Sequence, residues 1–107
     1  MSSYLKFINQ MRQIDETFSL GQYELRLLDL AAQAYFSDQP IRVQDLIIQK
    51  NIASQATLHA SLKKLLNKNL LTAKPHHQDG RQKNIVPTKL ALERYKKLHQ
   101  AMRRAIN

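Results

Sequence analysis

The side chains of this sequence that could do chemistry are mostly hydrogen-bond donors and cations. Gln55, His59 and Lys63 recur at intervals of four residues, so they share one face if this segment is helical. Amide, imidazole and ammonium groups on such a face can hydrogen-bond to base edges and phosphates. No carboxylate lies between Asp45 and Asp79, and a carboxylate there would repel phosphate. The pattern favours nucleic-acid binding.

Catalysis and metal binding have little support in the sequence. Cysteine is absent, and we find neither a glycine-rich phosphate loop nor a cluster of carboxylates. Asp15 and Glu16 end a predicted helix, and we expect them on its solvated side. His76 and His77 are adjacent, so in a strand their side chains point to opposite faces and cannot converge on a metal ion. We therefore predict a protein that is not an enzyme, with no cofactor and no metal site.

The distribution of charge indicates a polyanionic partner. Residues 1–62 hold five basic and six acidic side chains, a net of −1, whereas residues 63–107 hold twelve basic and two acidic, a net of +10. A one-sided excess of cations builds a field that attracts polyanions. Nucleic acid is the partner that this distribution favours; the alternatives are an anionic membrane surface and a basic protein that is merely soluble.

Length and hydropathy place the chain among small intracellular proteins. Its 107 residues suit one domain, 1–107. No apolar run approaches the roughly 18 residues of a membrane span, and the N-terminus lacks the apolar stretch of a signal peptide. We expect a cytoplasmic protein with no membrane partner.

The apolar spacing and the turn residues predict a helix-turn-helix followed by a hairpin. Helices are predicted at 3–17, from a cap at Ser19 or Gly21 to about residue 36, at 43–50, at 54–68 and from Thr88 to the end; an extended piece is predicted at 41–43, and strands at 70–76 and 83–86. The fold class is thus mainly α with a small β-hairpin wing, in the order α-α-β-α-α-β-β-α. In this winged helix-turn-helix, we expect the recognition helix, 54–68, in the major groove and the wing, 76–84, at the minor groove.

Five stretches, in this order and spacing, resemble the MarR family of regulators. They are Leu20-Gly21-Gln22-Tyr23-Glu24, Ile41-Arg42-Val43-Gln44-Asp45-Leu46, the two ends of the predicted recognition helix, and Asp79-Gly80-Arg81 followed by Thr88. The resemblance implies a sequence-specific, double-stranded DNA-binding transcriptional regulator.

The resemblance also implies roles for individual residues. Ser54, Gln55, Thr57, His59 and Lys63 would lie along the groove, with Lys64 nearer the phosphates. Arg81 matches the wing-tip arginine that enters the minor groove, and Asp79 would hold Arg81 or the hairpin backbone in place. Lys83, which starts the second strand, is a further candidate for phosphate contact.

The terminal helices carry apolar faces that favour a homodimer. The final helix places apolar residues at alternating spacings of four and three, which is a coiled-coil seam. The candidate interface consists of Tyr4, Phe7, Ile8 and Met11 of the first helix and Tyr95, Leu98, Met102 and Ala105 of the last. The resemblance implies dimerisation through the same helices. An intramolecular helix pair is the alternative use of these faces.

Two other functions stay open at this point. Winged helices also serve as protein-interaction modules, although such a module needs no basic recognition helix. An architectural or replication-associated DNA binder of low sequence specificity would share the same charge pattern. A small-molecule effector is possible but not indicated.

Overall fold

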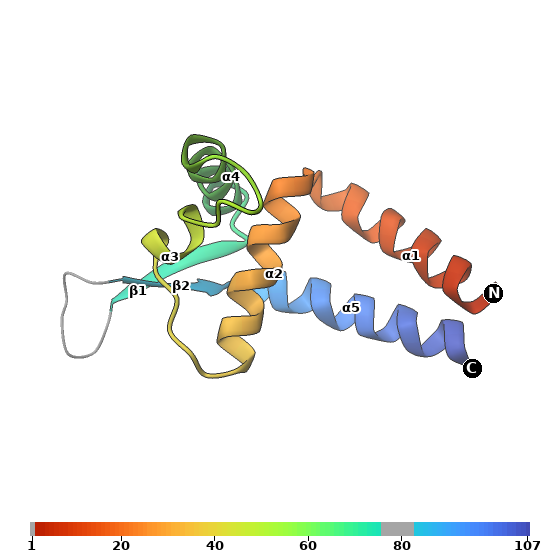
Figure 1. The fold of residues 1–107 in the computed structure, drawn as a ribbon. Helices are drawn as coiled ribbons and strands as arrows, with labels where there is room; N and C mark the ends of the chain where they lie inside the picture. The colour runs from red at the N-terminus through yellow and green to blue at the C-terminus, as the bar shows by residue number, and fades with distance from the viewer. Residues whose placement is uncertain (1, 76–82) are drawn as a thin grey trace.

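The computed structural model describes residues 2–75 and 83–107, and it is mainly helical with one antiparallel hairpin (Figure 1). The elements are α1 (Ser2–Phe18), α2 (Gln22–Phe36), α3 (Val43–Ile47), α4 (Gln55–Asn67), β1 (Leu71–Pro75), β2 (Lys83–Pro87) and α5 (Lys89–Ile106). The predicted fold class, a winged helix-turn-helix, is confirmed. The predicted recognition helix corresponds to α4, and the predicted strands 70–76 and 83–86 correspond to β1 and β2. Most of the predicted wing, 76–84, lies outside the described residues.

The core lies where α2, α3, α4 and the hairpin meet. Leu27 and Leu28 of α2, Leu46 of α3 and Leu58 of α4 are fully buried there, and Ile85 closes the core from β2. In α4 the buried Leu58, Leu62 and Leu65 follow the three-and-four spacing of a one-sided helix, so this helix buries one face and leaves the other in solvent. The core therefore fixes which face of α4 remains exposed.

The ends of the central helices follow from their capping residues. Gly21, rather than Ser19, is the N-cap of α2, since Ser19 adopts a left-handed backbone with φ of 52° that ends α1. At α4, the Ser54 hydroxyl accepts a hydrogen bond from the Thr57 backbone N–H at 3.2 Å. Asn69 closes α4 in the left-handed conformation, with φ of 59°, as its side chain predicts.

The extended piece predicted at 41–43 is not a strand. Its backbone makes one hydrogen bond to the hairpin, from Ile85 N–H to the Ile41 carbonyl at 2.7 Å. Pairing stops there because Val43 already begins α3, whose first turn is held by a 2.9 Å hydrogen bond from Arg42 N–H to the Asp45 carboxylate. The observed order is therefore α-α-α-α-β-β-α. Helix α3 is also shorter than predicted and ends at Ile47.

The hairpin pairs β1 with β2 in antiparallel register, from Leu71 opposite Pro87 to Pro75 opposite Lys83. Its base is attached to α5 by Thr88, whose hydroxyl accepts from Ala91 N–H at 3.2 Å and donates to the Asn69 carbonyl at 2.7 Å. One side chain thus caps α5 and ties it to the end of α4. The wing and the last helix cannot move independently at this point.

Helices α1 and α5 pack together and extend away from the hairpin as one arm, with both chain termini at its far end (Figure 1). Ala101 and Ala105 of α5 are buried, which is consistent with small side chains allowing two helices to approach closely. The molecule measures 48 × 28 × 22 Å. The arm and the wing lie at opposite ends of it.

Candidate nucleic-acid interface

The outward face of α4 carries the side chains that the sequence selected. Gln55, His59, Lys63 and Lys64 are all exposed, while Leu58, Leu62 and Leu65 are buried beneath them. Both lysines are free of ion pairs within the described residues. The exposed face therefore presents an amide, an imidazole and two ammonium groups to solvent, and no carboxylate.

Ser54 and Thr57 are engaged with each other at the start of α4. The Ser54 hydroxyl accepts from the Thr57 backbone and also lies 3.0 Å from the Thr57 hydroxyl. This pair fixes the first turn of α4, which contains Gln55. Both hydroxyls are thus used to hold the start of the helix.

Lys68, the C-cap of α4, is not a free cation. Its ammonium group donates to the Ser19 carbonyl and to the Glu24 carboxylate, each at 2.6 Å. Glu24 is a buried residue of α2 and also accepts from Gly21 N–H at 3.4 Å. The end of the recognition helix is thus fastened to the junction of α1 and α2. Sequence reasoning missed this contact, although the spacing of Gly21 and Glu24 identified the local cap.

The described part of the wing presents two exposed lysines. Lys74 stands near the end of β1 and Lys83 at the start of β2. The predicted wing-tip residues Asp79 and Arg81 lie outside the described residues. The wing base is consistent with the predicted phosphate contact by Lys83.

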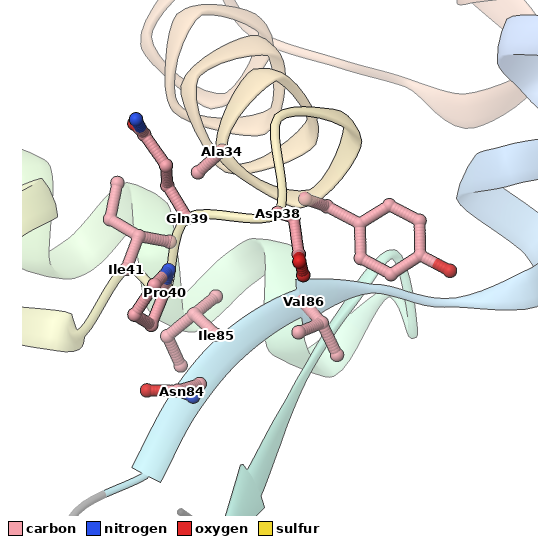
Figure 2. A pocket seen from close by; sticks show the side chains of 9 residues that line it. Ala34, Asp38, Gln39, Pro40, Ile41, Asn84, Ile85 and Val86 are labelled. Carbon is pink, nitrogen blue, oxygen red and sulfur yellow. The ribbon is translucent and has the colours of Figure 1, made fainter.

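A cavity of about 330 Å³ opens between the loop that follows α2 and the outer edge of β2 (Figure 2). Ile41, Ile85 and Val86 contribute apolar walls, and Asp38 points its carboxylate toward the strand. The Asn84 side-chain oxygen is buried without a hydrogen-bond partner. Among the described residues, no cation lines this cavity.

Two polar contacts fix the base of the arm: one joins α5 to α1, and the other joins α5 to α2. The Arg94 guanidinium, with 2% of its side chain exposed, donates through Nε and Nη2 to one Asp15 oxygen at 2.9 and 2.7 Å. The Tyr95 hydroxyl donates to Asp29 at 2.6 Å. Burial, followed by this hydrogen bond, raises the pKa of Tyr95 far above its usual value. The expectation that Asp15 lies on the solvated side of α1 is wrong, because Arg94 of α5 covers it.

The candidate dimer residues divide according to their exposure. Tyr4 and Met102 are exposed, at 66% and 43%. Six are wholly or partly covered within the chain: Phe7, Ile8, Met11, Tyr95, Leu98 and Ala105. Part of the predicted seam therefore forms the intramolecular contact between α1 and α5. Leu5 and Ile106 join the exposed apolar residues of the arm, at 53% and 72%.

The described residues contain no group of three histidine or carboxylate side chains placed to hold a metal ion. His76 and His77 lie outside this part of the chain. Among the helices of residues 2–75 and 83–107, none is long and apolar enough to cross a membrane.

Comparison with solved structures identifies several similar folds. The transcriptional regulator Tm0710 from Thermotoga maritima is 21% identical with a TM-score of 0.69; the match covers 91% of this chain, which spans 65% of that chain. The S. aureus MepR–DNA complex is 20% identical with a TM-score of 0.65, covering 90% and 75%. MarR is 12% identical with a TM-score of 0.60, covering 84% and 62%.

No family model matches the sequence, and no curated protein matches it significantly. At identities of 12 to 21%, the likeness is one of fold. The chain has the winged helix-turn-helix fold of the MarR-like regulators.

Proposed function

We propose that this chain is a sequence-specific, double-stranded DNA-binding transcriptional regulator of the MarR-like type. The observation that carries the proposal is the exposed face of α4, where Gln55, His59, Lys63 and Lys64 stand together without an acidic neighbour on the helix. A helix fits the major groove, where amide and cationic side chains read base edges and hold phosphates. The DNA complex of the similarly folded MepR supports the same assignment.

In this proposal α4 enters the major groove and the wing approaches the minor groove. Gln55 is the candidate for base contact, because glutamine can pair with adenine through two hydrogen bonds. Lys63 would lie along the groove, and Lys64 would contact phosphates. From the wing, Lys83 would contact phosphates and Arg81 would enter the minor groove. Asp79 would support the wing tip.

We also propose that the chain acts as one domain that dimerises through the ends of α1 and α5. A two-fold dimer presents two recognition helices about 34 Å apart, which matches one turn of DNA. Exposed Tyr4, Leu5, Met102 and Ile106 at the open end of the arm support this surface. The dimer interface is therefore smaller than the sequence alone indicates.

Salt dependence of binding to duplex DNA tests the proposal. Counterion release lowers the logarithm of the binding constant by about 0.9 per neutralised phosphate for each unit of log salt. A dimer touching roughly 6–10 phosphates should lose about a thousandfold or more in affinity between about 50 and 200 mM salt. Fluorescence anisotropy on random duplex measures this slope, and a flat response would contradict DNA binding.

A second measurement separates the regulator from the other functions. Selection of bound fragments from a random duplex library should enrich one sequence if α4 reads bases. An architectural binder would bind with the same salt slope but enrich no sequence, and a protein-interaction module would bind no duplex at all. No observation in the described residues favours either alternative.

A further inference from the structure

The solvent-facing side of α5 carries a band of cations, the α5 stripe, which consists of Lys89, Lys96, Lys97, Arg103 and Arg104. All five side chains are exposed, and Glu93 is the single acidic residue of the helix. Residues seven apart differ by about 20° around a helix, so Lys89, Lys96 and Arg103 form one row. Lys97 and Arg104 form a second row about 100° round from it, beside α1. Together the five cations cover about a third of the circumference over about 22 Å of the helix. None of them takes part in an ion pair within the described residues.

The α5 stripe is separate from the candidate interface on α4. Arg94, Ala101 and Ala105 face the interior from the other side of α5, and Arg94 is about 140° around the helix from Lys89. The arm that carries the stripe extends to the opposite end of the molecule from the wing (Figure 1). A straight duplex held by α4 and the wing would leave the outer part of the stripe free.

Local structure does not account for this charge. Cations stabilise the last turn of a helix through its dipole, which explains Arg103 and Arg104. Lys89 is the first residue of α5, where the same dipole disfavours a cation. Glu93 alone has too little negative charge to neutralise the five cations. The stripe is therefore matched to a polyanion.

We propose that the α5 stripe binds the phosphate backbone of a second DNA duplex, so that the protein bridges two DNA segments. This inference rests on the proposed function, because the first duplex is the one held by α4. Lysine and arginine dominate the stripe, so the contact is made to phosphates and is independent of sequence. A membrane surface fits less well, since insertion requires a continuous free apolar face: Ala91, Ala101 and Ala105 of α5 are buried, and Tyr95 and Leu98 are partly covered.

A bridging assay tests the proposal with the whole chain. One duplex is fixed to beads, the protein is added, and retention of a second, fluorescent duplex is measured at about 100 mM salt. The variant Lys96→Glu/Arg103→Glu reverses two charges of the stripe. Its matched control is Lys6→Glu/Arg12→Glu, which makes the same change of net charge at exposed positions of α1. Affinity for a single duplex and the melting temperature are measured for each protein.

We expect wild type and the α1 control to retain the second duplex, and the stripe variant to retain at least about tenfold less. Its affinity for a single duplex should stay within about threefold of wild type. Single-duplex binding by wild type without bridging would overturn the inference and leave the proposed function standing. An equal loss of bridging in the α1 control, or an equal loss of single-duplex affinity in the stripe variant, would also overturn it. Failure of wild type to bind any duplex would instead refute the proposed function.

Discussion

Removal of the Asp15 carboxylate tests how α1 and α5 are joined within the arm. Asp15 accepts two hydrogen bonds from Arg94, at 2.9 and 2.7 Å, and the Arg94 side chain is 2% exposed. Arginine remains charged at any pH that a folded protein tolerates. The change Asp15→Ala therefore leaves a buried guanidinium without a counter-charge. Its third nitrogen, Nη1, already lacks a hydrogen-bond partner.

Removing one partner of a buried ion pair typically lowers the free energy of unfolding by about 3–5 kcal/mol. Both side chains here are well below one-third exposed, at 2% and 17%, so solvent screens the pair only weakly. Because a domain is stable by about 5–15 kcal/mol, we expect Asp15→Ala to lose a large share of its stability. At about 4–8 °C per kcal/mol, the melting temperature should fall by about 12 °C or more.

Thermal and urea denaturation, followed by circular dichroism, measure this loss. Glu16→Ala is the matched control, since its exposed side chain makes no ion pair within the described residues, and it should change stability by less than about 0.5 kcal/mol. The double variant Asp15→Leu/Arg94→Met removes both charges and should be more stable than Asp15→Ala. A cost below about 1 kcal/mol for Asp15→Ala is typical of solvent-exposed pairs and would refute this reasoning.

Three further predictions concern DNA reading, pH and assembly. Gln55→Ala should cost about 1–3 kcal/mol on the selected site and much less on random duplex, whereas Lys64→Ala should weaken both about equally; anisotropy titrations compare the two. Because burial and the bond to Asp29 raise the pKa of Tyr95 above its unfolded value of 10.0, its contribution to stability is full below about pH 10 and is lost as pH rises further. Urea midpoints between about pH 8 and 11 should therefore fall more in wild type than in Tyr95→Phe. Met102→Asp places a charge at the open end of the arm and should shift sedimentation toward the monomer; a wild type that is monomeric at tens of micromolar, with and without DNA, would contradict the dimer.

The local signals of the sequence were sufficient for most elements of the fold. Ser54 and Thr88 cap α4 and α5 as predicted, and Asn69 adopts the left-handed conformation, because capping depends on a few neighbouring residues. The strand predicted at 41–43 was wrong because strand formation, unlike capping, depends on residues far away in the sequence. Strand pairing needs a partner edge, and the early start of α3 at Val43 leaves one hydrogen bond, from Ile85 to Ile41.

The exposed face of α4 could likewise be predicted from its leucine spacing. Burial of Leu58, Leu62 and Leu65 leaves Gln55 and Lys63 in solvent, and this follows from helix periodicity alone. The sequence alone therefore determined the helix-turn-helix, the hairpin base and the composition of the candidate reading face.

What the tertiary structure decided is the use of the charged residues. In the sequence, Lys68, Arg94 and Lys96 are three equivalent cations. In the structure, Lys68 donates a hydrogen bond to Glu24, which is 44 positions away in the sequence, and Arg94 donates to Asp15, which is 79 positions away. Lys96 stays exposed on the arm. Such pairings depend on how α1, α2 and α5 come together, and no local pattern encodes them. The basic half of the sequence is thus divided by packing into cations that face solvent on α4, cations that hold the fold together and cations of the α5 stripe.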